Sequence, residues 1–170
     1  MKREGSGVRR STNDEPDSAT RLTPDAWRLT HVRFRASIDG AARGNPGPSG
    51  AGVYVEAEAD RLAEEHFEAL GETTNNVAEY RALLLALRRA EELGASQVEI
   101  RSDSLLLVEQ LRGRYKVKAQ HLKPLFVEAV TRAKRFPRFS IDHIPREKNA
   151  EADRLANLGA DSSESAGLRR

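Results

Sequence analysis

The stretch that decides the fold is VRFRASIDGAARGNPGPSGAGVYVEAEA, residues 32–59. Apolar and polar residues alternate on both sides of a Gly-Pro run, which predicts two β-strands joined by a turn. Asp39 ends the first predicted strand and precedes a glycine. It is either a turn residue whose side chain bonds its own backbone, or a functional carboxylate beside a turn.

The rest of the chain extends this pair of strands into an α/β pattern. A third strand is predicted at 61–70, after a bend at Asp60 and Arg61 that indicates a hairpin. Further along, we expect a helix with a 3.6-residue apolar repeat, a strand, two helices, a strand and a helix capped by Asn149, at residues 73–94, 97–103, 104–113, 123–136, 139–144 and 149–160. Three meandering strands followed by strand–helix–strand crossovers predict a mixed sheet with helices on both faces.

Length and composition favour one domain with polar ends. The chain has 170 residues, and we expect a disordered tail at 1–30, a folded domain at 31–160 and a flexible tail at 161–170. No apolar run reaches the roughly 18 residues of a membrane span. Cysteine is absent, which excludes thiolate catalysis and favours a cytoplasmic protein without membrane partners. A net charge of +2 is weak evidence for a nucleic-acid partner.

Three further acidic residues have local interpretations of their own. Asp103 or Ser102 is a good N-cap for the helix that follows. Glu79 follows Asn76 by three residues, as in a capping box, although Thr73, Thr74 or Asn75 could cap the helix and leave Glu79 free. Asp153 lies in or just past a first helical turn, where its charge complements the helix dipole. Each residue alone is as readily structural as functional.

Taken together, the four acids indicate a metal centre. Asp39 and Asp103 end strands that we place side by side, while Glu79 and Asp153 lie near helix N-termini at the same end of the sheet. Clustered carboxylates repel one another unless a cation holds them. Hard cations such as Mg²⁺ or Mn²⁺ prefer carboxylate oxygens, and a pair of them can promote phosphodiester cleavage.

Other catalytic motifs are missing. The segment GNPGPSGAG lacks the Lys-Ser/Thr pair of a P-loop and does not open a helix, and no G-x-S-x-G nucleophile elbow surrounds Ser49. The four histidines have no metal-ligand spacing. The basic segment RGRYKVKAQHLK, residues 112–123, is either a nucleic-acid contact or a solvated loop.

Four separate blocks resemble the type 1 ribonuclease H family, in its compact bacterial and archaeal form. They are DGAARGNPGPSGAG (39–52), TTNNVAEY (73–80), RSDS (101–104) and HIPREKNAEADRLAN (143–157). The resemblance covers about residues 35–160. It implies a ribonuclease H-like fold, an α/β architecture with a five-stranded mixed sheet in the order 3-2-1-4-5.

The resemblance also implies an activity and a set of residues. It implies endonucleolytic cleavage of the RNA strand of an RNA–DNA hybrid with two Mg²⁺ or Mn²⁺ ions, leaving 5′-phosphate and 3′-hydroxyl ends. The catalytic and metal-binding set falls on Asp39, Glu79, Asp103 and Asp153. Hybrid-contacting positions fall on Asn45, Asn75 and Asn76, with backbone groups from Gly40 to Arg43 close to the RNA. Arg146, which departs from the family pattern, is a further candidate as a phosphate-binding cation. We expect a monomer, and duplex RNA stays open as a second substrate.

Two departures from the family pattern bear on the mechanism. Many relatives carry a histidine shortly before the last aspartate, where this chain has Arg146. Arginine stays protonated and cannot act as a general base, and His143 is placed on the strand. The long basic protrusion of some relatives is reduced here to the segment 112–123.

Rival functions remain on the same fold. A non-catalytic nucleic-acid-binding module is disfavoured by four intact acids, which would repel a phosphate backbone. A related nuclease acting on structured DNA or duplex RNA is the second rival. The asparagine-bearing loops suit recognition of a 2′-hydroxyl and so favour RNA over DNA, but they do not exclude duplex RNA as a side activity. An ATPase of actin-like architecture would need a much longer chain.

Overall fold

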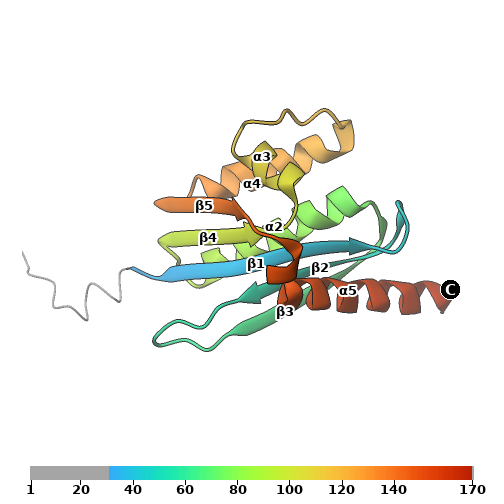
Figure 1. Ribbon diagram of the computed structural model, residues 1–170, viewed down its shortest axis with the longest axis horizontal. Helices are drawn as coiled ribbons and strands as arrows, with labels where there is room; N and C mark the ends of the chain where they lie inside the picture. Colours follow the sequence, from blue (N-terminus) through green and yellow to red (C-terminus); the bar gives the residue numbers. More distant parts are fainter. Residues whose placement is uncertain (1–30, 170) are drawn as a thin grey trace, which may run out of the picture.

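The computed structural model describes residues 31–169 and contains one five-stranded sheet in the order β3-β2-β1-β4-β5 (Figure 1). The elements in chain order are β1 (Arg33–Ala42), β2 (Gly47–Val55), β3 (Glu64–Thr73), α2 (Asn75–Glu92), β4 (Gln97–Ser102), α3 (Leu105–Leu111), η1 (Gln120–Leu122), α4 (Lys123–Ala133), β5 (Arg138–His143), η2 (Arg146–Lys148) and α5 (Ala150–Leu168). The predicted fold class and strand order are confirmed.

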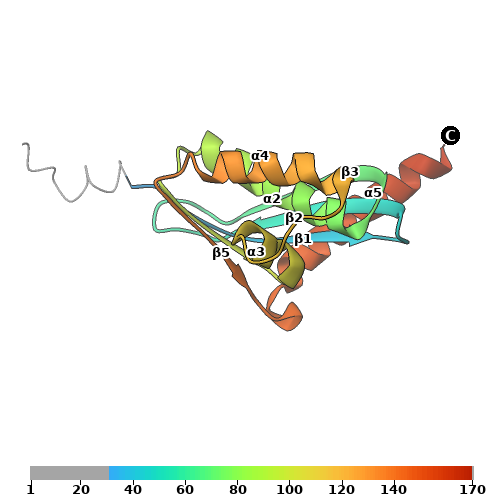
Figure 2. The same cartoon turned by 90° about the horizontal axis from the view of Figure 1, so that it is seen from above.

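The sheet is mixed because its two halves are connected differently. β1, β2 and β3 form antiparallel pairs through short connections, whereas β4 is parallel to both β1 and β5. α2 and α4 cover one face and α5 lies against the other (Figure 2). The core between the first face and its helices is built from apolar residues of β1, β4 and α2, including Phe34, Ile38, Ile100, Leu83 and Leu87.

The glycines of the opening stretch allow α5 to lie directly on β2. A Cβ atom on Gly52 would come within 2.3 Å of the Ala156 backbone nitrogen and 2.5 Å of the Ala152 carbonyl oxygen. No side chain fits in that space, so a glycine is required where strand and helix backbones touch. The close approach of a helix to this strand was not predicted from the sequence.

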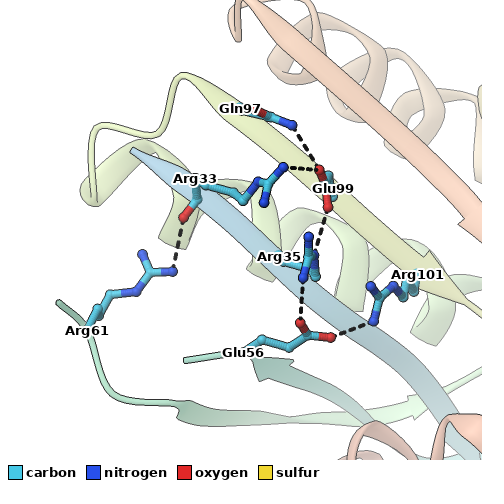
Figure 3. Close-up of polar contacts among 7 residues, drawn as sticks. All are labelled: Arg33, Arg35, Glu56, Arg61, Gln97, Glu99 and Arg101. Atoms are coloured by element: carbon cyan, nitrogen blue, oxygen red, sulfur yellow. Dashed lines mark hydrogen bonds and ion pairs between the residues drawn. The ribbon is translucent and has the colours of Figure 1, made fainter. Parts of the chain in front are cut away.

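The face opposite α2 carries a network of ion pairs beyond the end of α5 (Figure 3). Arg35 on β1 contacts Glu99 at 2.7 Å and Glu56 at 3.3 Å, and Glu56 also pairs with Arg101 of β4. Alternate residues of a strand share a face, so Arg35 and Asp39 project on the same side of β1. Charged side chains therefore hold β1 and β4 together on this face, where no helix covers them.

The structure corrects three expected boundaries. α5 continues to Leu168, although a flexible tail was expected from residue 161, because tertiary contacts hold its last turns. Ser163 donates a hydrogen bond to the Ser49 carbonyl and accepts one from the Gly71 amide. Asp39 lies inside β1 rather than at its end, and β3 begins at Glu64 rather than 61.

Two other predictions concern the N-terminal tail and membrane-spanning segments. The tail expected at 1–30 lies outside the described residues. Between residues 31 and 169, no helix combines the length and the apolar character needed to cross a membrane.

Candidate active site

Three acidic side chains from different elements meet at one end of the sheet. Asp39 comes from β1, Glu79 from the first turns of α2, and Asp103 follows β4. Carboxylate oxygens of the three lie within 4.8 Å of one another. Asp39 and Glu79 are 6% and 5% exposed, so these two carboxyl groups are largely removed from water, whereas Asp103 is half-buried.

Hydroxyl side chains cap the two helices and leave the acids free. Thr74 accepts the hydrogen bond from the Val77 amide at the N-terminus of α2. Ser104 accepts the one from the Leu107 amide at the N-terminus of α3. Of the open alternatives for α2, the Thr74 cap is the one found, whereas the interpretation of Asp103 or Ser102 as a cap of α3 is wrong.

Asp153 joins the cluster from α5, which lies on the sheet face opposite α2. It lies one helical turn after Asn149, and a hydrogen bond between Asp39 and Asp153 contributes to the pKa of Asp39. The structure thus brings the four predicted acids to one site. Asn149 occupies the N-cap position of α5, but its side chain makes no capping hydrogen bond, contrary to our expectation.

Burial and mutual repulsion raise the pKa values of the central carboxyls. Burial, together with the charges of Asp103 and Asp153, raises the pKa of Asp39 to about 7. Burial and the charges of Asp39 and Asp103 raise the pKa of Glu79 well above its usual range, against a backbone hydrogen bond from Gly40 that lowers it. Crowded, desolvated carboxylates of this kind are stabilised by a cation.

A buried carboxylate oxygen without a hydrogen-bond partner indicates whether a divalent cation fits the cluster. The Oε2 atom of Glu79 is buried and has no hydrogen-bond partner. A buried carboxylate oxygen without a donor is costly unless a positive charge is close to it. The residues present therefore fit a hard cation such as Mg²⁺ or Mn²⁺.

The acids line a cleft of about 400 Å³. Its wall is formed by Asp39, Gly40, Ala41, Ala42, Asn75, Glu79, Asp103, Ser104, Arg146, Asp153 and Asn157. A Cβ atom on Gly40 would come within 2.4 Å of the Glu79 backbone nitrogen. Glycine is needed there because any side chain would push α2, and Glu79 with it, away from β1.

Only some of the residues predicted to contact the hybrid line the cleft. Gly40, Asn75 and Arg146 line the cleft, and the Asn45 side chain accepts a hydrogen bond from the Asn75 amide. Asn76 is exposed in the first turn of α2 and does not line the cleft. Arg43 is directed to α5 by ion pairs with Asp161 and Glu164.

The structure also shows which residue occupies the position of the family's loop histidine. Arg146 lines the cleft, whereas His143 does not. The Nε2 atom of His143 lies 3.2 Å from the main-chain carbonyl oxygen of Asp103. His143 therefore contacts the backbone that carries an acid rather than the acid itself.

Sequence reasoning missed Ser104 and Asn157 as part of the cleft wall. Ser104 adjoins Asp103, and Asn157 follows Asp153 by four residues, so both lie beside a predicted acid. The Asn157 amide donates to the Asp153 carbonyl and its oxygen accepts from Arg43. The helical repeat could have indicated Asn157, since residues at i and i+4 share a helix face.

The fold and the acidic cluster define a protein of the ribonuclease H-like class. A family model described as "Reverse transcriptase-like" matches residues 37–159. Ribonuclease HI of Halobacterium salinarum is 38% identical over 142 residues, which cover 84% of this chain and 69% of the relative. The chain belongs to the type 1 ribonuclease H family.

Other comparisons extend this placement. The structure of LC11-RNase H1 in complex with an RNA/DNA hybrid is 43% identical, with a TM-score of 0.70 over 76% of this chain and 98% of that one. The "Bifunctional protein Rv2228c" of Mycobacterium tuberculosis is 45% identical over 126 residues, 74% of this chain. The chain spans 35% of the length of that relative.

Proposed function

We propose that this protein is an endonuclease that hydrolyses the RNA strand of RNA–DNA hybrids and leaves 5′-phosphate and 3′-hydroxyl ends. One observation carries the proposal: acids distant in sequence converge within 4.8 Å in a cleft. The match to LC11-RNase H1, whose structure contains an RNA/DNA hybrid, supports the choice of substrate.

The four acids would hold two Mg²⁺ or Mn²⁺ ions. When bound, such ions activate a water molecule and stabilise the leaving oxygen of the scissile phosphate. The chain contributes a rigid, partly desolvated frame. Asp39 comes from the middle strand of the sheet, and Glu79 is held against it by the close contact of Gly40 with α2.

Residues around the acids would recognise the RNA strand. The Asn45 and Asn75 amides can complement a 2′-hydroxyl, which both donates and accepts hydrogen bonds. Their position is fixed by the bond from the Asn75 backbone to the Asn45 side chain. Arg146 would bind a phosphate oxygen as a permanent cation, because its guanidinium cannot remove a proton at neutral pH.

The proposal also covers the margins of the cleft, the oligomeric state, the location and a second substrate. Arg43 and Asn76 would contact the hybrid at the margins of the cleft, and Arg43 would exchange its acidic partners on α5 for phosphate. We propose that the protein acts as a monomer in the cytoplasm. Duplex RNA would be a poorer substrate than the hybrid.

Cleavage assays with end-labelled hybrid, duplex DNA and duplex RNA in Mg²⁺ test this function. We expect cleavage of the hybrid in its RNA strand and loss of at least 100-fold in kcat for Asp103→Asn, because one carboxylate of the cluster is removed. Asp60→Asn, an equivalent change in the β2–β3 connection, serves as the control and should keep full activity. Hybrid cleavage that survives Asp103→Asn would overturn the proposed mechanism.

A further inference from the structure

Asn149 is a buried amide between β1, which carries Asp39, and the first turn of α5, which carries Asp153. Only 1% of its surface is exposed, and it lies one turn before Asp153 at the start of α5. A helix N-cap residue ordinarily accepts hydrogen bonds from the first free amides of its helix. The side chain of Asn149 makes no such bond, so helix capping does not explain its burial.

The amide group instead bonds the strand that carries Asp39. Asn149 Nδ2 donates to the main-chain oxygen of Ile38 at 2.9 Å. Ile38 is the last β1 residue in register with β4, where it pairs with Ser102. The Asn149 side chain thus bonds β1 at the point where its pairing with β4 ends. This point lies directly before Asp39, the first acid of the cluster.

The same connection also holds the end of β4. The Ile144 amide donates to the Ser102 carbonyl at 2.9 Å, and His143 contacts the Asp103 carbonyl. The segment 143–149 therefore bonds the backbone next to Asp39 and the backbone next to Asp103. Asn149 is its last residue and leads directly into the helix of Asp153.

The other end of the Asn149 amide is unsatisfied. Its Oδ1 atom is buried and has no hydrogen-bond partner. A buried acceptor without a donor opposes folding. An apolar residue of similar size would remove this penalty but would take the Asn149 donor away from the buried Ile38 carbonyl, so the two effects oppose each other. Stability alone does not favour asparagine here, which points to a demand of the site.

We propose that Asn149 is a positioning residue for metal binding, whose bond to Ile38 holds the carboxylates of Asp39 and Asp153 at the separation that a divalent cation requires. The inference rests on the proposed function in that it assumes a metal at the acids. Groups that orient metal ligands typically change metal affinity by about 10- to 100-fold when they are removed. Asn149 would act in this way on two ligands at once.

Calorimetric titration of Mg²⁺ into the full chain without nucleic acid tests the proposal. We expect Asn149→Leu to weaken Mg²⁺ binding by at least tenfold, with a melting temperature close to that of the wild type. Ser163→Ala is the matched control. Ser163 also donates from α5 to a strand carbonyl, that of Ser49, but it lies ten residues beyond Asp153 and should leave Mg²⁺ affinity unchanged.

Kinetics provide a second readout. Asn149→Leu should lower kcat at limiting Mg²⁺, regain most of it at saturating Mg²⁺ and leave the KM for hybrid unchanged. Mg²⁺ can also rescue a destabilised fold by binding the folded state, so an unchanged melting temperature of Asn149→Leu is what separates a positioning role from a folding defect. If Asn149→Leu does not fold, Asn149→Ala gives the same comparison with less steric change.

The outcomes separate this inference from the proposed function. Wild-type protein that neither binds Mg²⁺ nor cleaves hybrid overturns both. Wild-type protein that binds Mg²⁺ and cleaves hybrid, together with an Asn149→Leu variant of equal Mg²⁺ affinity, overturns only the positioning role. Weakened Mg²⁺ binding in Ser163→Ala as well would also overturn it, because the effect would then be general to α5.

Discussion

At the scale of single residues, the acidic cluster lowers the stability of the metal-free fold, because it holds buried carboxyl groups close together in an arrangement that suits a bound cation. Burial and neighbouring negative charge raise the pKa values of Asp39 and Glu79. The same features that make the carboxyls difficult to ionise in isolation make them good ligands once a positive charge is present. The cost should therefore be visible in the metal-free protein.

We expect the metal-free protein to lose stability as the pH rises from about 4 to 7. The pKa of Asp39 is 3.8 when unperturbed and about 7 in the folded protein. The folded state therefore binds more protons in this window, and unfolding becomes easier as they are lost. At 1.36 kcal/mol per pKa unit, the decrease in unfolding free energy is on the order of 4 kcal/mol.

Urea unfolding in EDTA at pH 5 and pH 8 measures this effect. Asp39→Asn should reduce the pH dependence, since one of the two buried carboxyl groups with raised pKa values is gone. Mg²⁺ binds only the folded, deprotonated cluster and should stabilise the protein more at pH 8 than at pH 5. An unchanged slope in Asp39→Asn would show that other groups dominate.

At the scale of elements, the site depends on the close approach of α5 to β2. Asp153 can join acids from β1, α2 and β4 because the α5 backbone lies directly on Gly50 and Gly52, where β2 has no side chains. The last turns of α5 extend this contact through Ser163 and through the ion pairs of Arg43. α5 is thus both a part of the site and the cover of one sheet face.

Gly52→Ala should damage both roles. The added methyl group would meet backbone atoms of α5 at 2.3 and 2.5 Å, so helix and strand must separate. We expect a loss of about 1–3 kcal/mol in unfolding free energy and a lower kcat. Thermal unfolding and the cleavage assay measure the two effects.

Gly167→Ala is the matched control within α5. No atom lies within 4 Å of a Cβ atom there, so the substitution should be neutral or stabilise by up to about 1 kcal/mol through helix propensity. Equal stability of the Gly52→Ala and wild-type proteins would show that the helix can shift without cost.

At the scale of the whole molecule, one sheet is stabilised differently on its two sides. Helices bury an apolar core against one face, whereas the part of the other face beyond α5 relies on the ion pairs of Arg35, Glu56, Glu99 and Arg101 (Figure 3). These side chains are about a quarter to a third exposed, so water and salt weaken their attraction.

Glu56→Gln tests how much this network contributes. The change removes the charge that pairs with both Arg35 and Arg101, and we expect a loss of about 1 kcal/mol or less. The difference from the wild type should shrink in 1 M NaCl if it is electrostatic. A large, salt-independent loss would indicate packing instead, and activity should be unaffected in either case.

Local patterns in the sequence were enough for the order and type of the elements. The alternation of 32–39 and the helical repeat of 73–94 depend on neighbours within a few residues, so they can be recognised without the fold. The metal-binding and catalytic roles of the four acids stay predictions, but the structure brings those acids together. The resemblance to a family contributed the strand order, which spacing alone does not determine.

Only the tertiary structure decided how competing uses of a residue were resolved. Thr74 and Ser104 cap the helices, while Arg43 turns to acids on α5 and the Asn149 side chain bonds β1 instead of its own helix. In each case, the alternatives differ little in local energy. For Arg43 and Asn149, the choice depends on groups more than 100 residues away in the chain, Glu164 and Ile38, and only folding brings these groups together.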